Sequence, residues 1–371
     1  MAPTTGKIPF NALDRQNGGE LTARLAAAAR EVIERGWYVL GREVAAFEEE
    51  FAAYCGARHA IGVANGSDAL ELAIASLDLP RDSEIAVAPN AAMYATLGIL
   101  ANGLRPRFVD VDADTATMHA DALEAALTPD TRAVVVTHLY GRLAEMDGLL
   151  AIARRHGLAV IEDCAQAHGA ARAGRRAGSF GQLACFSFYP TKNLGAIGDG
   201  GAVVSSDDAL AARVRQLRQY GWGSKYAVAV AHGRNSRLDE LQAAFLRIKL
   251  PLLDDWNARR RDIAARYTAG ITHPAITRPA LDGDAWVAHL YVIQCERRDA
   301  LRAHLEAHAI GVDVHYPIPD HRQPLLAAAH AGLSLPQAER QARTALSLPC
   351  FAELRDEEVE AVIVACNTWS S

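Results

Sequence analysis

The amino-acid sequence predicts an α/β fold in which a large domain with a mostly parallel sheet precedes a smaller α+β domain. Between residue 58 and about residue 205, short runs rich in β-branched residues alternate with amphipathic helical patterns, which is typical of a parallel sheet covered by helices. The pattern changes after residue 286. A chain of 371 residues also exceeds the size at which one hydrophobic core stops growing, which favours two unequal domains.

The large domain is expected to begin with two helices, over residues 19–35 and 43–55, joined by an irregular crossing in the segment WYVLGREV. Seven strands are predicted after them, because each run is apolar, rich in β-branched residues and bounded by turns. The strands span residues 59–63, 84–88, 106–111, 132–138, 158–163, 183–188 and 201–206. Helical spacing of apolar residues predicts helices between the strands, over 67–77, 119–127 and 145–156.

The chain is expected to enter the small domain through the helical stretch 236–270, which Pro251 interrupts. Downstream, the runs HLYVIQC and VDVHY are typical of strands. Helical patterns lie at 298–309, 335–346 and 355–366. We therefore expect residues 1–250 to form the N-terminal helices and the large domain, and residues 251–371 to form the small one.

Composition and charge exclude several classes of protein. A net charge of −6 without a long basic run argues against nucleic acid as a partner. The first residues lack the apolar core of a signal peptide and no stretch reaches the roughly 18 apolar residues of a membrane span, so we expect a cytoplasmic protein with no membrane partner. The cysteines are not spaced as in zinc or redox motifs, so we expect reduced, buried thiols and no metal site. They are Cys55, Cys164, Cys185, Cys295, Cys350 and Cys366.

The segment VANGSDALELAIASL predicts a strand that turns at Asn65 and Gly66 and enters a helix at Ser67 or Asp68. Such a junction aims free backbone N–H groups and the positive end of the helix dipole at the space before it, which stabilises a phosphate. Simple N-capping explains the same residues. The junction alone therefore leaves both interpretations open.

Asp163 follows the hydrophobic run LAVIE, at the carboxyl edge where open α/β sheets bind ligands. A charged residue at that edge needs a partner. One candidate is a protonated pyridine nitrogen, because such a ring withdraws electrons well only when a carboxylate keeps it cationic. Capping of a following helix is the alternative.

Lys192 lies in a loop between the buried run LACFSF and a glycine-rich return to another strand. Burial would disfavour its ammonium form and lower its pKa, giving the neutral amine that imine chemistry requires. A solvated surface lysine is the alternative for this residue taken alone. The run GDGGA (198–202) precedes a strand and lacks the GxGxxG spacing, so we reject a dinucleotide-binding loop.

In combination, the turn, the strand-edge carboxylate and the loop lysine predict a pyridoxal 5′-phosphate site in which Lys192 carries the cofactor as a Schiff base. Over nearly its whole length the chain also resembles the nucleotide-sugar aminotransferases of the DegT superfamily. The resemblance implies fold type I of the pyridoxal-phosphate-dependent transferases. The shared motifs are GWYVLG (36–41), NGSDAL (65–70), HLYG (138–141), IEDCAQAHGA (161–170), SFYPTKNLGAIGDGGAV (187–203), NSRLDELQAA (235–244) and HYPIPDH (315–321).

The resemblance implies two catalytic residues. Lys192 would move protons between the substrate carbon and the cofactor carbon, and Asp163 would hold the pyridine nitrogen. Gln166 would face the ring oxygen of the cofactor. One departure concerns the stretch PNAAMYAT (89–96), in which Met93 takes the place of the family's aromatic residue over the ring. A polarisable thioether can pack on a ring, and Tyr94 is the alternative stacking residue.

The cofactor phosphate has four implied ligands. The backbone amides of Gly66 and Ser67 and the hydroxyl of Ser187 would bind it within one chain. Asn235 would reach it from the neighbouring subunit of a homodimer, so that the two chains share their active sites. From the residues alone, Asn235 would instead cap a local turn before the helix that follows.

The implied reaction is a two-stage transamination, with L-glutamate as amino donor and a keto sugar as acceptor. The motifs most resemble members that aminate carbon 3 of a dTDP-linked 3-keto-6-deoxyhexose. Arg237 is a candidate for binding the donor carboxylate as a planar fork, and a helix-surface arginine is the alternative. Five residues are candidates for binding the nucleotide sugar, and a purely structural or surface role is the alternative for each. They are Tyr38, Tyr189, Lys225, His315 and Tyr316.

Three other functions compete with this interpretation. A related dehydratase would carry histidine in place of the lysine, and Lys192 argues against it. A noncatalytic regulator of the same fold would not need an imine-forming amine. An aminotransferase for a cyclitol or a 4-keto sugar would share every cofactor residue, and the sequence leaves it open.

Overall fold

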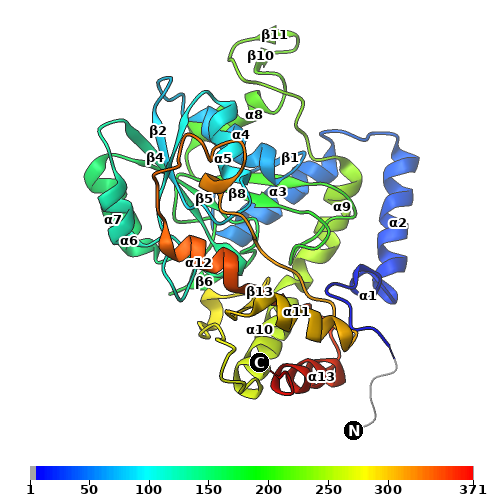
Figure 1. The fold of residues 1–371 in the computed structure, drawn as a ribbon. Helices are drawn as coiled ribbons and strands as arrows, with labels where there is room; N and C mark the ends of the chain where they lie inside the picture. Colours follow the sequence, from blue (N-terminus) through cyan, green and yellow to red (C-terminus); the bar gives the residue numbers. More distant parts are fainter. Residues whose placement is uncertain (1–5, 371) are drawn as a thin grey trace.

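The computed structural model describes residues 6–370 and is built around a seven-stranded sheet (Figure 1). The strands are β1 (His59–Val63), β2 (Glu84–Val87), β3 (Arg105–Phe108), β4 (Thr131–Thr137), β5 (Ala159–Asp163), β8 (Leu183–Ser187) and β9 (Gly201–Ser205). Their order is β1-β9-β8-β5-β4-β2-β3; β9 runs antiparallel to both neighbours and the other pairs are parallel. The predicted α/β fold with a mostly parallel sheet is confirmed.

The strands form where the sequence predicts them because their side chains are buried on both faces. In β4, which reads TRAVVVT, every residue except Arg132 is buried. Such a continuous apolar run suits a parallel strand between two helical layers. The predicted bounds agree within one residue except in β3, which ends at Phe108, whereas Val111 pairs with Met118 in an isolated bridge.

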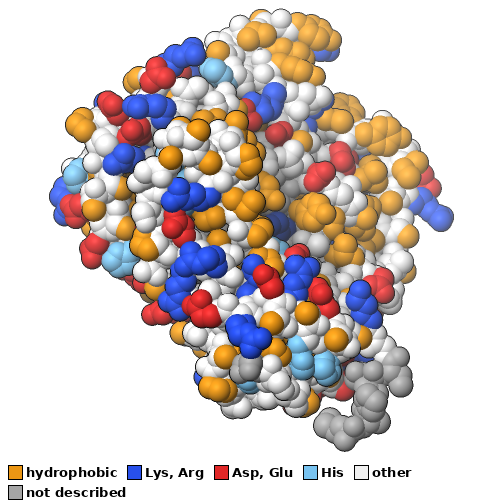
Figure 2. Space-filling model, viewed as in Figure 1, with side chains coloured by type: hydrophobic (Ala, Val, Ile, Leu, Met, Phe, Trp, Pro, Cys, Tyr) orange, Lys and Arg blue, Asp and Glu red, His pale blue; other side chains and the backbone are white. Residues whose placement is uncertain are grey.

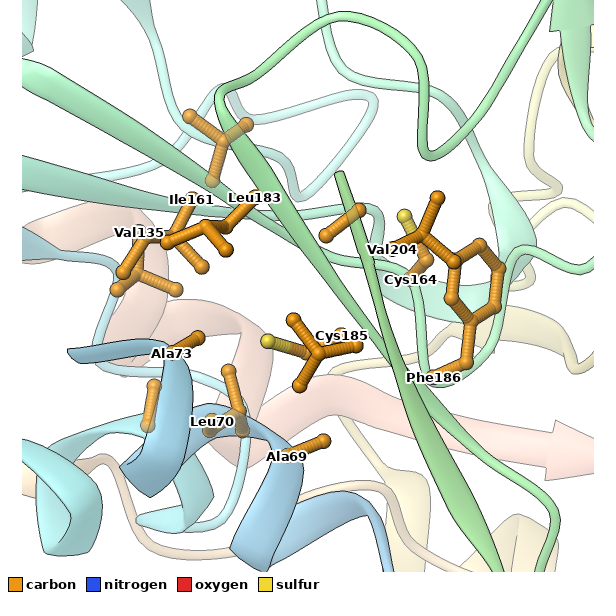
Figure 3. Packing of buried hydrophobic residues seen from close by; sticks show 14 of the residues in the cluster. Ala69, Leu70, Ala73, Val135, Ile161, Cys164, Leu183, Cys185, Phe186 and Val204 are labelled. Atoms are coloured by element: carbon orange, nitrogen blue, oxygen red, sulfur yellow. The ribbon is translucent and has the colours of Figure 1, made fainter. Parts of the chain in front are cut away.

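Helices cover the sheet, and α4 packs closely against it (Figure 1). In Figure 3 its small side chains Ala69 and Ala73, together with Leu70, face Cys185 of the sheet. Small residues let the helix axis lie close to the strands, which places the start of α4 beside their ends. The helices of this part are α1 (Leu13–Gln16), α2 (Glu20–Arg35), α3 (Arg42–Cys55), α4 (Gly66–Ser76), α5 (Tyr94–Ala101), α6 (Ala120–Ala126), α7 (Met146–His156), α8 (Asp208–Leu217) and α9 (Glu240–Lys249).

A second hydrophobic core lies at the bottom of Figure 1, around the paired strands β12 and β13. Ile8 and Ala12 also pack into it, whereas Leu326 and Leu335 pack into the core of the large sheet. An N-terminal segment thus contributes to the second core, and a C-terminal segment contributes to the core of the large sheet. The domain boundary at residue 250 therefore stays a prediction. The elements here are α10 (Leu253–Gly270), β12 (Tyr291–Gln294), α11 (Arg298–Ala307), α12 (Pro336–Thr344), β13 (Ala345–Leu348) and α13 (Asp356–Asn367).

Three further comparisons with the sequence predictions concern element bounds. The stretch 236–270 is helical from Glu240, because Asp239 accepts a hydrogen bond from the Gln242 amide and caps α9. A 3-10 helix, η2 (Leu250–Leu252), interrupts it at Pro251 as predicted. The strand expected in VDVHY is wrong: the run contributes an isolated bridge at Asp313, and prolines follow soon after it.

Two short hairpins were not predicted, since strands of two or three residues show no periodicity. One of them projects from the top of the molecule in Figure 1. They are β6 (Ala171–Arg172) with β7 (Arg175–Arg176), and β10 (Trp222–Ser224) with β11 (Ala227–Val228).

Large hydrophobic side chains are exposed on the projecting hairpin and near the C-terminal end of α2. Tyr226 is 77% exposed, Val228 67% and Trp37 61%. Figure 2 shows hydrophobic side chains gathered on the hairpin and around a hollow in the middle of this face. Exposed apolar side chains that gather on one face favour an interaction surface. Among residues 6–370, no helix is long and apolar enough to cross a membrane.

Candidate active site

Three neighbouring strands bring the predicted site residues to one edge of the sheet. β4 and β5 are in register, with Thr137 opposite Asp163, and Asp163 in turn lies opposite Cys185 in β8. β8 ends two residues later, at Ser187. Because these strands are parallel, their carboxyl ends meet at the edge where α/β sheets bind ligands.

Asp163 is a buried carboxylate with few protein partners. It is 5% exposed, and its Oδ1 accepts a hydrogen bond from the Ala165 amide at 3.1 Å. Thr137 approaches Oδ2 only at 3.4 Å. Burial raises the pKa of Asp163, while the Ala165 amide and the charge of Lys192 oppose this shift. The second oxygen can therefore accept a strong hydrogen bond from a cationic partner.

Lys192 supplies an amine poised for carbonyl chemistry. Its side chain is partly buried, and its ammonium makes no hydrogen bond or ion pair with any described residue. Burial lowers the pKa of Lys192 to about 8, although the negative charge of Asp163 works against the shift. Roughly a tenth of the amine is thus neutral at pH 7, far more than for a lysine of ordinary pKa.

The residues after Lys192 are fixed by α9, α10 and the segment before β12. Asn193 is 1% exposed and bonds to Asn257 at 2.8 Å and to His289 at 2.9 Å. The Nζ of buried Lys249 donates to the Gly195 carbonyl at 2.8 Å. These bonds leave the loop little freedom, so the backbone that carries the amine is held in place.

The start of α4 forms a small cradle against Ser187. A Cβ built on Gly66 would lie 2.6 Å from the Ser187 Cβ, so only glycine allows the helix to begin there. Asn65 caps the helix by accepting the Asp68 amide at 2.8 Å, so the helix begins at Gly66 and not at Ser67 or Asp68 as expected. The amides of Gly66 and Ser67 remain free of bonds to described residues. Free amides and a hydroxyl at a helix N-terminus fit a phosphate group.

Gln166 is oriented by two tyrosines, of which Tyr140 was not selected from the sequence. Its Oε1 accepts the Tyr140 amide at 2.6 Å, and its Nε2 donates to the Tyr316 hydroxyl at 3.1 Å. The Tyr140 hydroxyl in turn donates to the carbonyl of His315. Tyr140 lies in the motif HLYG, but its role depends on contacts 26 and 175 residues away, which no local pattern displays.

Met93 and Tyr94 lie at the junction before α5 and differ in exposure. Met93 is 8% exposed and packs in the large core, whereas Tyr94 is 49% exposed. Ala92 and Met93 both take left-handed backbone conformations, with φ of 56° and 68°. Which of the two side chains covers the cofactor ring stays a prediction.

The remaining candidates lie in two places. His315 meets the Tyr316 ring edge-to-face and bonds to the Ser347 hydroxyl at 2.9 Å, and Tyr316 in turn bonds to Gln166. The others lie at the surface, although the Tyr189 carbonyl accepts a hydrogen bond from the Lys192 amide at 2.8 Å, and Asp239 rather than Asn235 caps α9. These are Tyr38, Tyr189, Lys225, Asn235 and Arg237.

Glu162, next to Asp163, anchors the strand from its other side. Its oxygens accept from His138 Nε2 at 2.9 Å and from the amides of Gly178, Phe180 and Gly181 at 2.7–3.0 Å. Burial alone would raise the pKa of Glu162, yet His138 and these amides lower it, so the carboxylate is ionised.

Replacing Glu162 by alanine is therefore expected to destabilise the fold by about 3–5 kcal/mol, because it leaves buried donors without an acceptor. Urea unfolding measures this loss. The matched control is Glu357→Ala, whose side chain is 53% exposed and pairs with Arg355; it should change stability by less than about 0.5 kcal/mol. Equal unfolding midpoints for the two variants would contradict the anchoring role.

Comparisons with known proteins agree with this geometry. A model of the "DegT/DnrJ/EryC1/StrS aminotransferase family" matches residues 20–367. The dTDP-3-amino-3,4,6-trideoxy-alpha-D-glucose transaminase of Streptomyces venezuelae is 46% identical over 99% of this chain and 97% of its own. The dTDP-3-amino-3,6-dideoxy-alpha-D-galactopyranose transaminase of Aneurinibacillus thermoaerophilus is 45% identical over 98% of this chain and 99% of its own.

Solved structures give the same result. The crystal structure of DesV from S. venezuelae, described as a complex with a ketimine intermediate, superposes with a TM-score of 0.93 and 46% identity, covering 98% of this chain and 99% of that one. The predicted resemblance, the fold type and the enzyme class are confirmed, and pyridoxal phosphate is the cofactor. This chain belongs to the DegT/DnrJ/EryC1/StrS aminotransferase family.

Proposed function

We propose that the protein transfers the amino group of L-glutamate to a nucleotide-linked keto sugar, converting a dTDP-3-keto-6-deoxyhexose to its 3-amino sugar. The observation that carries the proposal is the amine of Lys192, of lowered pKa, beside the buried carboxylate of Asp163. The choice of sugar is supported by two relatives of 45–46% identity whose names give dTDP-linked 3-amino sugars.

The site residues fit pyridoxal phosphate, which when bound supplies an electron sink for bond breaking at the substrate carbon. Asp163 would hold the ring nitrogen, since its Oδ2 lacks a close donor. Gln166 would face the ring oxygen. Lys192 would attach the cofactor and carry the proton between the two reacting carbons through its Nζ.

For the phosphate, the cradle that a Cβ on Gly66 would fill supports binding by the amides of Gly66 and Ser67 and by the hydroxyl of Ser187. Met93 or Tyr94 would cover the ring. Candidate substrate contacts remain Arg237 for the glutamate carboxylate and, for the nucleotide sugar, Tyr38, Tyr189, Lys225, His315 and Tyr316. The cytoplasmic location also stays a prediction.

The reactivity of Lys192 should depend on pH with a midpoint near its pKa of about 8. Only the neutral amine attacks a carbonyl, so below pH 8 the rate of cofactor attachment should rise roughly tenfold per pH unit, and above it the rate should level off. The measurement is the growth of the visible absorption band after apoprotein is mixed with pyridoxal phosphate. A flat profile between pH 6 and 8 would show that Lys192 is not the group that titrates.

The protein is proposed to form a homodimer with shared active sites. The proposal is supported by the exposure of Asn235 and of the apolar side chains Trp37, Tyr226 and Val228. If Asn235 completes the partner's site, mixing Lys192→Ala and Asn235→Ala subunits should restore activity, because one site of each hybrid is native. Random mixing should give about a quarter of wild-type activity, since half the dimers are hybrids with one native site. Activity no higher than that of the two separate variants would contradict shared sites.

The proposed function is tested by the two half-reactions. L-Glutamate alone should bleach the visible cofactor band, and a dTDP-3-keto-6-deoxyhexose should restore it and yield the 3-amino sugar, detected by mass spectrometry. A 4-keto sugar and a keto cyclitol serve as comparison acceptors. Faster turnover of either would replace the 3-keto assignment, and a band that glutamate leaves unchanged would favour the noncatalytic regulator.

A further inference from the structure

The segment between α11 and α12 leaves the small domain, reaches α5 and returns (orange in Figure 1). At its far end lies the 3-10 helix η4 (Asp320–Arg322), in which Asp320 is 1% exposed. The Asp320 amide donates to the Pro89 carbonyl at 2.7 Å. A residue of the C-terminal part of the chain is thus built into the stretch 89–96, which carries Met93.

The Asp320 carboxylate binds the turn that opens α5, a helix without a side-chain cap. Its Oδ1 accepts the Met93 amide at 2.9 Å and its Oδ2 accepts the Thr96 hydroxyl at 2.6 Å. The neighbouring basic residues of η4, His321 and Arg322, contact Glu339 instead. A buried carboxylate without a cation depends on such donors and on the positive end of the helix dipole.

The backbone at this junction requires an external support. Ala92 and Met93 are consecutive non-glycine residues with φ of 56° and 68°, a left-handed conformation that side chains disfavour. Such conformations persist where surrounding contacts fix them, and they occur often at functional sites. Here the fixing contacts on Met93 and on the first turn of α5 come from Asp320.

We propose that Asp320 is a positioning residue, which fixes the Ala92–Met93 turn from the small domain and so sets how Met93 and Tyr94 meet the ring of the bound cofactor. The inference rests on the proposed function, because it takes the ring to lie before this turn. Burial raises the pKa of Asp320 to about 6 while the Thr96 and Met93 donors oppose the shift, so the carboxylate is mostly ionised at neutral pH. Its charge is therefore available to hold the helix start.

The test compares variants of Asp320, which accepts the hydrogen bonds, with variants of Thr96, which donates one of them. Asp320→Asn and Thr96→Val should each weaken pyridoxal-phosphate binding on the order of tenfold and change the circular dichroism of the visible cofactor band, since a looser turn lets the ring tilt. Thr96→Ser keeps the hydroxyl and should behave as wild type. The double variant should lose little more than either single one, because both break the same contact.

The matched control is Asp207→Asn, which removes a carboxylate that caps α8 through the Ala209 and Leu210 amides. It should leave the cofactor band and cofactor affinity unchanged. Wild-type affinity and dichroism in Asp320→Asn would overturn the proposal. If Asp320→Asn does not fold, wild-type cofactor affinity and dichroism in Thr96→Val would also overturn the proposal. A wild-type protein that binds no pyridoxal phosphate would instead refute the proposed function.

Discussion

Replacing Lys192 by alanine is expected to abolish transamination, with a loss of kcat on the order of 10⁴-fold, since the attachment of the cofactor and the proton transfer both depend on its Nζ. The fold should survive, because the Lys192 ammonium makes no hydrogen bond with any described residue. Reduction of the wild-type holoenzyme with borohydride should fix the cofactor on Lys192, and peptide mass spectrometry identifies the modified lysine. The variant should show no such product.

The chain suits this experiment because it contains only four lysines: Lys7, Lys192, Lys225 and Lys249. Lys7 is exposed, and Lys7→Ala is the matched control that should keep the visible band and full activity. Lys249 is buried against the Gly195 carbonyl. Cofactor fixed on Lys225 or Lys249, or an active Lys192→Ala protein, would contradict the assignment of the imine-forming residue.

Asp163→Asn should lower kcat/KM by about 10²–10³-fold, because the neutral amide cannot stabilise a cationic ring nitrogen in this buried position. The amide oxygen can still accept from Ala165, so the local backbone should remain. The loss should appear mainly in kcat, since the phosphate cradle at Gly66 and Ser187 is untouched. Steady-state kinetics with both substrates measures it.

The same substitution should also shift the pH profile of cofactor attachment. The negative charge of Asp163 raises the pKa of Lys192, so its removal should move the midpoint below about 8. Asp207→Asn, at an exposed helix cap remote from the strand edge, is the control for a lost carboxylate. An unchanged kcat/KM together with an unchanged midpoint would exclude Asp163 as the partner of the ring nitrogen.

Much of the fold follows from local patterns. The apolar run of β4 and the Pro251 break between α9 and α10 are visible in the sequence, because burial on both faces and the missing proline N–H act on neighbouring residues. The two short hairpins could not be predicted, because strands of two or three residues are too short to show a periodic pattern. In VDVHY the apolar alternation predicts a strand, yet only an isolated bridge at Asp313 forms within the described chain.

By itself, the sequence determined the α/β order of elements and the chemical groups of the site: Lys192 in its loop, Asp163 at a strand end and the Gly66 turn. The tertiary structure decided how these groups are tuned and held. The burial that lowers the pKa of Lys192, the tyrosines on Gln166 and the bonds of Asp320 to the turn before α5 all depend on residues far apart in the chain. Such contacts depend on packing and desolvation, which arise only when the two cores meet, so no local pattern of residues encodes them.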